Sequence, residues 1–217
     1  MTRIVIFAKA PLPGCVKTRL IPALKAEGAA TLARKLLAHT VQQALAADVG
    51  EVELCMSPAP ADPAWHGVAL PNLVEQTGQG EGDLGERMAR AVRRCTQHTE
   101  SAPEFVMLIG TDCPALTAPL LNQASQQLAH HDAALLPAHD GGYVLLGLKF
   151  PCPELFEKMT WSTSTVCFET LQRMAALNMR VWQGPTLHDI DEPADLQHVT
   201  DFLLEPLQSN RPTQAPA

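Results

Sequence analysis

The strongest constraint on the fold is a regular alternation of strand-like and helix-like segments. Short apolar runs, rich in β-branched residues or in alanine and leucine, alternate with longer helix-forming stretches, and this predicts a mostly parallel sheet with helices on both faces. A late strand-like run follows its predecessor after a short loop, which predicts one antiparallel pair. The expected strands are 3–8, 51–56, 73–76, 105–109, 133–137, 143–148 and 180–183, and the expected helices are 26–47, 83–97, 117–130, 164–177 and 193–204.

The chain has 217 residues, which suits one α/β domain of the single-domain, Rossmann-like, three-layer α/β/α class. We expect this domain to span residues 1–205, with the proline-rich polar stretch 206–217 as a disordered tail. A net charge of -7 argues against non-specific nucleic-acid binding, which depends on lysine and arginine. The sequence leaves the oligomeric state open.

Cysteine usage and the first residues predict a cytoplasmic protein. The six cysteines form no CxxC pair and no zinc-type spacing, so reduced core cysteines are the expected state. The apolar run before Lys9 is too short for a signal peptide or a membrane span.

The polar motifs of the sequence follow directly after predicted strands, where ligands bind in open α/β sheets. The first motif carries lysine and arginine, which bind phosphate, and a glycine that allows close backbone approach. The alternative is a surface turn followed by a solvated basic stretch. The candidate phosphate-binding residues here are Ala8, Lys9, Pro13, Gly14, Lys17 and Arg19.

Asp112 ends an apolar strand in the sequence Gly-Thr-Asp, where a magnesium or manganese ion can bridge phosphates. From spacing alone, a turn-capping role fits Asp112 equally well. Asp140 precedes Gly141 and Gly142, and it can help to bind a metal or accept a hydrogen bond from a sugar hydroxyl; the same Asp-Gly pattern is also a strong hairpin signal, and the two roles are compatible. Tyr143, the only tyrosine, is a candidate ligand contact in the same motif.

Three further motifs complete the candidate site. A glycine-rich loop leads into the helix that starts at Asp83, and the N-terminal amides of this helix can meet an anion; alternatively, Asp83 caps the helix with Glu86. Asp189 and Asp191 lie at i and i+2 of an extended segment, so both carboxylates face one side and can complete a metal site or orient a lysine. A sugar or acceptor pocket is predicted from Gly141, Gly142, Tyr143, Trp161, Ser162 and Thr163.

Taken together, these motifs resemble a bacterial glycosyltransferase-A-like (nucleotide-diphospho-sugar transferase) family, whose members are uncharacterised or are linked to arsenosugar biosynthesis. The fold is also similar to that of molybdenum-cofactor and phospholactate guanylyltransferases. The matching blocks are 7–20, 82–88, 109–114, 137–143, 161–163 and 189–193.

The resemblance implies that the first loop holds a nucleotide and that Asp112 binds Mg²⁺ or Mn²⁺, with Asp191 as a candidate second ligand. The leading hypothesis is a glycosyltransferase with a nucleotide-diphospho-sugar donor and a small-molecule acceptor, in which Asp140 or Asp189 is the catalytic base. The alternatives are a guanylyltransferase-like nucleotidyltransferase that releases pyrophosphate and a non-catalytic nucleotide-binding protein.

Overall fold

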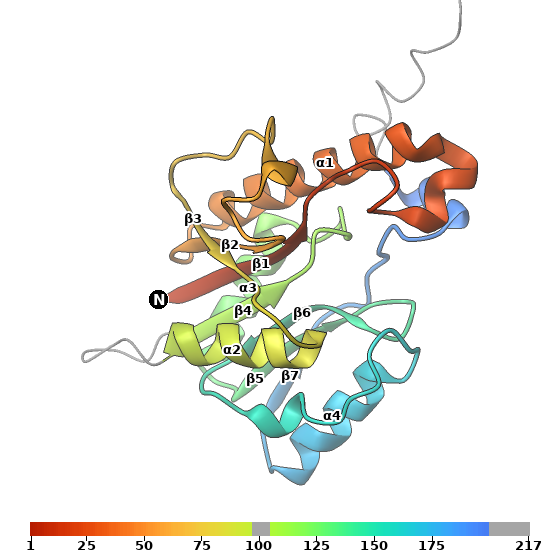
Figure 1. Cartoon of the computed structure of the whole chain (residues 1–217). Coiled ribbons are helices and arrows are strands. Elements are labelled where there is room, and N and C mark those ends of the chain that lie inside the picture. The colour runs from red at the N-terminus through yellow and green to blue at the C-terminus, as the bar shows by residue number, and fades with distance from the viewer. Residues whose placement is uncertain (97–104, 200–217) are drawn as a thin grey trace, which may run out of the picture.

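The computed structural model describes residues 1–96 and 105–199. Its strands form one mixed sheet in the order β3-β2-β1-β4-β6-β5-β7 (Figure 1). The strands are β1 (Thr2–Lys9), β2 (Val52–Ser57), β3 (Val74–Gly78), β4 (Phe105–Ile109), β5 (Ala133–Pro137), β6 (Tyr143–Leu148) and β7 (Val181–Gln183). The helices are α1 (Ile21–Ala47), α2 (Leu84–Thr96), α3 (Ala118–Leu128) and α4 (Val166–Ala176), with short 3-10 turns η1 (Thr18–Leu20), η2 (Pro63–Trp65), η3 (Pro153–Leu155) and η4 (Pro193–His198).

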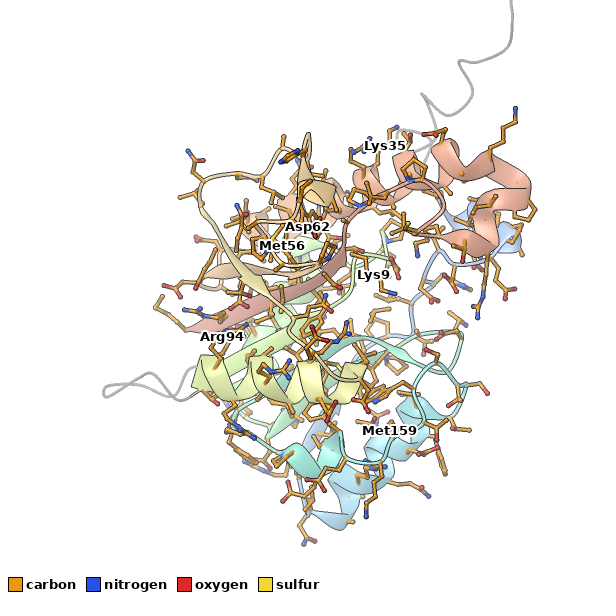
Figure 2. All side chains as sticks on the ribbon, viewed as in Figure 1. Lys9, Lys35, Met56, Asp62, Arg94 and Met159 are labelled. Atoms are coloured by element: carbon orange, nitrogen blue, oxygen red, sulfur yellow. The ribbon has the colours of Figure 1, made fainter. Side chains whose placement is uncertain are left out.

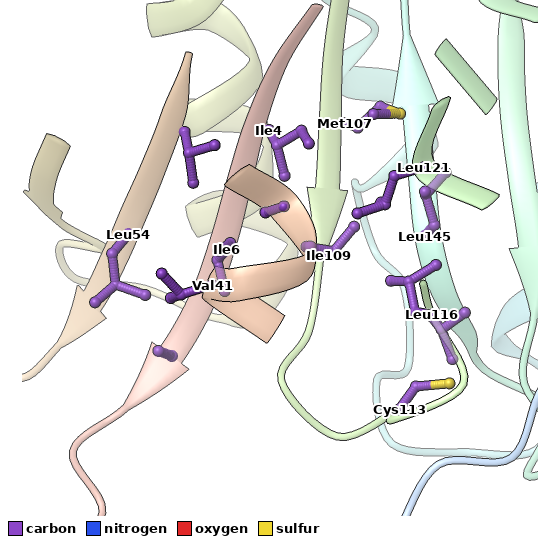
Figure 3. Packing of buried hydrophobic residues seen from close by; sticks show 14 of the residues in the cluster. Ile4, Ile6, Val41, Leu54, Met107, Ile109, Cys113, Leu116, Leu121 and Leu145 are labelled. Carbon is purple, nitrogen blue, oxygen red and sulfur yellow. The ribbon is translucent and has the colours of Figure 1, made fainter. Parts of the chain in front are cut away.

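Helices cover both faces of the sheet, as the alternation predicts. Helices α1 and α3 pack on one face against buried residues that include Ile6, Met107 and Leu145 (Figure 3). Helices α2 and α4 pack on the other face, where Val5 and Leu146 belong to a second buried cluster. Because strand side chains alternate between faces, strands such as β1, β4, β5 and β6 contribute to both clusters. The predicted three-layer α/β/α arrangement is confirmed.

Strand β6 is the one reversed strand of the described sheet, and it pairs antiparallel with both β4 and β5. The expectation of a single antiparallel pair was therefore incomplete, because β6 inserts between two strands. Its reversal brings the start of β6 to the same sheet edge at which β4 and β5 end.

Two predicted helices differ from their expected bounds. Helix α1 starts at Ile21, before the predicted Ala26, and contains a break at Lys25, whose φ of 60° is not helical. The predicted helix 193–204 is a 3-10 turn over Pro193–His198, capped by Glu192 and Asp195; residues 200–204, like the predicted tail 206–217, lie outside the described residues. In the part described, no helix is both long and apolar enough to cross a membrane.

Candidate functional site

An open cavity of about 560 Å³ lies at the carboxyl edge of the sheet. Its walls come from the ends of β1 and β4, the β5–β6 hairpin, the start of α2, the loop before α4 and the chain after β7. A smaller adjoining cavity of about 120 Å³ shares Asp112, Asp140 and Asp189 with it. Segments far apart in the sequence therefore meet at the edge where α/β folds bind ligands.

The first loop connects β1 to η1 and brings Lys17 to Asp112. The Nζ atom of Lys17 lies 2.9 Å from Oδ1 of Asp112 and 3.9 Å from Oδ1 of Asp191, and the Lys17 side chain is only 6% exposed. Arg19 donates from Nη1 to Oδ2 of Asp191 at 2.6 Å. The two cations of the loop are thus held next to the predicted metal aspartate.

The segment 184–192, here called the strap, runs from β7 across the sheet edge towards the start of α1 (Figure 1). It is fixed by backbone hydrogen bonds from Leu187 N to Pro137 O (2.9 Å) and from Ile190 N to Asp112 O (2.8 Å). Ile190 is fully buried in a cluster with Leu20 and residues of α1. These contacts place Asp189 and Asp191 against the cavity.

Asp189 lies in an acidic environment. Burial raises the pKa of its carboxyl, and the nearby charges of Asp140 and Asp112 raise it further, while Lys17 lowers it. Ionisation of Asp189 is therefore costly unless a cation binds close by.

The residues of the cavity suit a magnesium or manganese ion in the type of donor they offer. Asp112, Asp140 and Asp189 supply carboxylate oxygens, the ligands that Mg²⁺ prefers. Among the described residues, no three His, Cys, Asp or Glu side chains are gathered closely enough to form a ready-made metal site. A magnesium site usually contains one or two carboxylates together with substrate phosphates and water.

The Asp140 hairpin has a fixed geometry. The Gly142 amide donates to Oδ1 of Asp140 at 2.7 Å, and within the described chain the other carboxylate oxygen accepts no hydrogen bond. Gly141 has a φ of 89°, and a Cβ there would lie 2.1 Å from the Ser164 carbonyl oxygen. Only glycine fits this close approach, so the hairpin is held against the loop that carries Trp161 and Ser162.

Aromatic side chains line the cavity together with the carboxylates. Trp161 packs on Gly85, where an added Cβ would lie 2.8 Å from the indole ring. Tyr143 lines the cavity, but its hydroxyl points to Met88 Sδ (3.9 Å) and to Thr170, and burial raises its pKa. The ring of Tyr143, rather than its hydroxyl, is therefore available to a ligand.

Several predicted residues lie outside this cavity. Asp83 and Glu86 exchange hydrogen bonds between side chain and backbone (2.8 and 2.9 Å), which is the capping box expected from the sequence, and Asp83 lines a separate cavity beside α2. Lys9 does not line the cavity either. Figure 2 shows it at the carboxyl end of β1, away from Arg94 on α2. The other first-loop candidates that do not line the cavity are Ala8, Pro13, Gly14 and Lys17; Lys17 reaches the site only through its contact with Asp112.

The sequence motifs did not identify several residues that support or line the cavity. Gln79 is 6% exposed, and its side-chain amide donates to the carbonyls of Ala8 and Cys55 (3.1 and 3.0 Å), which fixes the end of β1. Phe7, Leu84 and Met88 line the cavity as apolar residues, and no polar motif marks them in the sequence. Only the register of β1 and the knowledge of which face of α2 points to the cavity could have indicated that these residues line it.

Comparisons with known proteins agree with this architecture. The DUF2064 family model, described as "Uncharacterized protein conserved in bacteria", matches residues 40–163. No curated protein matches this chain. A solved structure from Desulfovibrio desulfuricans G20, provisionally named a nucleotide-diphospho-sugar transferase, is 30% identical with a TM-score of 0.81, over 96% of this chain and 88% of its own.

Two more distant structures share the fold. The manganese complex of Rv0371c from Mycobacterium tuberculosis H37Rv is 15% identical with a TM-score of 0.51, over 92% of this chain and 97% of its own. A nucleotidyl transferase from Methanothermobacter thermautotroptrophicus is 14% identical with a TM-score of 0.56, over 95% and 99%. At these identities the likeness concerns the fold alone.

Proposed function

This chain belongs to the bacterial DUF2064 family, and on that premise we propose that it is a metal-dependent glycosyltransferase that uses a nucleotide-diphospho-sugar donor. The observation that carries the proposal is the cluster of Asp112, Lys17 and Arg19 beside the cavity at the carboxyl edge. A carboxylate for a metal and two cations for phosphates are what a nucleotide diphosphate requires. The 30% identical relative, named for the same donor class, supports it.

We assign the divalent ion to Asp112, with Asp189 rather than Asp191 as the second carboxylate. Asp189 shares the inner cavity with Asp112, whereas Asp191 lines only the larger cavity. When bound, the ion supplies charge neutralisation for the departing diphosphate. Lys17 and Arg19 add positive charge at the same place.

The remaining carboxylate, Asp140, is the proposed base. In the transfer step, the bond between the sugar's anomeric carbon and the diphosphate oxygen breaks, and a bond from that carbon to an acceptor oxygen forms. The acceptor hydroxyl gives its proton to Asp140, and the nucleoside diphosphate leaves with the electron pair of the broken bond. The oxygen of Asp140 that Gly142 does not engage is the one available for this proton.

The second candidate function is nucleotidyl transfer, which the fold shared with the Methanothermobacter nucleotidyl transferase favours. The two activities differ in their products. Sugar transfer releases a nucleoside diphosphate, whereas nucleotidyl transfer releases pyrophosphate. Product analysis of nucleotide sugars and nucleoside triphosphates incubated with the protein therefore separates them.

Asp112→Asn tests the shared premise of metal-dependent nucleotide binding. We expect the wild-type protein to be stabilised by a nucleotide or nucleotide sugar together with Mg²⁺ or Mn²⁺, by about 2.7 kcal/mol at a hundredfold excess over the dissociation constant. The variant should lose this metal-dependent shift, as measured by thermal denaturation. Asp48→Asn is the matched control, because Asp48 is an exposed helix cap outside the cavity and asparagine accepts its left-handed backbone.

The outcome of this screen also tests the non-catalytic alternative. Metal-dependent binding without turnover of any donor would favour a nucleotide-binding protein without catalysis. A wild-type protein that binds no nucleotide in the presence of either metal would refute all three functions.

A further inference from the structure

The cavity is lined by two chemically different sets of residues, here called the acidic wall and the apolar wall, and together they restrict the acceptor. The acidic wall has carboxylates from three separate segments of the chain; the apolar wall has residues from α2, β6, the loop before α4 and the start of α4. The acidic wall consists of Asp112, Asp140, Asp189, Asp191 and Glu192, and the apolar wall of Leu84, Met88, Tyr143, Val144, Trp161 and Val166.

The cations beside the cavity are already paired. Lys17 contacts Asp112, and Arg19 contacts Asp191. Within the described chain, Asp140 and Asp189 have no lysine, arginine or histidine in salt-bridge range. The carboxylates of the cavity outnumber its cations. A diphosphate donor and its divalent ion carry nearly equal and opposite charges, so binding both leaves the net negative charge of the cavity largely unchanged.

Close packing fixes the position of the apolar wall. Trp161 rests against Gly85, and the Gly141–Ser164 approach holds the neighbouring loop on the Asp140 hairpin. Met88 and Val144 are nearly buried, with exposed fractions of 5% and 7%. Leu84, which is 42% exposed, extends this surface towards solvent. An aromatic and aliphatic surface of this kind binds the apolar face of a sugar ring or an aromatic group.

We infer that the acceptor is an uncharged or cationic small molecule that bears a hydroxyl or amine group and an apolar face, and that phosphorylated acceptors are rejected. The inference rests on the proposed function, because it describes the second substrate of the same cavity. An anionic acceptor would place its charge next to Asp140, which has no cationic partner within the described chain, and like charges without a compensating partner strongly oppose binding. The same argument disfavours a substrate phosphate as the attacking group.

Matched sugar probes test this inference without a donor. The full chain in Mg²⁺ is titrated calorimetrically with 4-nitrophenyl glucoside, with its 6-phosphate, and with the corresponding 2-amino-2-deoxyglucoside. We expect the neutral and cationic probes to bind at least about tenfold more tightly than the phosphate. Equal or tighter binding of the 6-phosphate would overturn the inference, and so would a failure of all three probes to bind.

Variants assign the preference to the two walls. Asp140→Asn should reduce the discrimination against the 6-phosphate, while Trp161→Ala should weaken all three probes and leave their order unchanged. Trp161→Phe should restore most of the lost affinity, which separates stacking from misfolding. Phe168→Ala is the control for aromatic loss, because Phe168 is 62% exposed and is not part of the cavity wall.

The titration and the nucleotide screen fail in different ways. Absence of nucleotide binding refutes the transferase proposal but does not alter the order of the sugar probes. Conversely, a protein that binds nucleotide sugars with metal and prefers phosphorylated sugars keeps the proposed function and loses this inference.

Discussion

Lys17 combines a left-handed backbone conformation (φ 48°) with a nearly buried side chain between two carboxylates. Left-handed conformations cost energy in residues other than glycine, asparagine and aspartate, and they concentrate at functional sites. The sequence predicted phosphate-binding roles for Lys17 and Arg19 from charge density alone. It could not predict that Asp191 pairs with both, because that contact spans more than 170 positions.

The contacts of Asp83, in contrast, follow from the local sequence. Two interpretations were open from the sequence, and its reciprocal hydrogen bonds with Glu86 follow the local capping pattern. A capping box depends on residues three positions apart, so local reasoning suffices for it. The grouping of Asp112, Asp140 and Asp189 depends on strand order, which no local pattern fixes.

Asp189→Asn should stabilise the metal-free protein at neutral pH. The folded-state pKa of Asp189 is raised by burial and by Asp140 and Asp112, so its ionised form is disfavoured in the folded state. The gain should be present above the folded pKa and should vanish below about pH 4, where the wild-type carboxyl is protonated in folded and unfolded states alike.

Thermal denaturation of both proteins in chelator, across this pH range, measures the effect. Added Mg²⁺ with a nucleotide should then favour the wild type, since only its carboxylate binds the ion well. A variant that is less stable than the wild type at neutral pH in chelator would contradict the expectation.

Among the elements, α1 departs most from its expected form. Its sequence predicted a start at Ala26, and the structure shows an added turn from Ile21 that is joined to the main helix through Lys25, at φ 60° and ψ 168°. The added turn follows from tertiary packing, because Leu20 is buried with Leu32, Leu36 and Ile190 beneath it. Helix propensity reflects local preferences only, so it does not predict that contact.

Lys25→Gly should stabilise the protein. The backbone of Lys25 lies in a region that only glycine adopts freely, so relief of this strain should outweigh the entropy that glycine adds to the unfolded state, for a net gain of about 1 kcal/mol. For a chain of this size the expected rise in Tm is roughly 2–4 °C.

Lys25→Ala is the matched control, because it removes the exposed side chain but keeps the Cβ. If both variants raise the Tm equally, loss of the lysine charge and not backbone strain is the cause.

Across the whole molecule, the buried Glu53 ties together parts of the sheet and of α2. Its side chain is fully buried; it accepts a hydrogen bond from the Thr77 hydroxyl at 2.5 Å and pairs with Arg3 of β1 and Arg94 of α2. This network lies away from the cavity, because none of its members lines the cavity wall. Its role is therefore structural.

Glu53→Gln should destabilise the fold by about 1.5–3 kcal/mol, because Arg94 loses the charge of its carboxylate partner, whereas Arg3 keeps Glu51 and Glu75. Glu51→Gln removes an exposed partner of Arg3, with 58% of the side chain accessible, and should cost less than about 1 kcal/mol. Urea denaturation of the three proteins measures the difference. Similar losses in both variants would show that burial of Glu53 is not what makes it important.

The layered architecture followed from the order of segments, since alternation of strands and helices leaves few topologies. The position of β6 did not, because sequence separation alone does not say whether a hairpin strand lies at an edge or inserts beside β4. Insertion of β6 is nonetheless what brings Asp140 and Tyr143 to the edge where Asp112 lies.

The strap has a consequence for how the protein matures on the ribosome. Residues 1–148 contain six of the seven strands, yet Asp189, Asp191 and the hydrogen bond to the Asp112 carbonyl come from the segment after β7. Since chains fold from the N-terminus as they are made, the sheet can assemble before its ligand site is complete. A nascent chain thus carries an unfinished cavity, which is completed only when the strap emerges and docks.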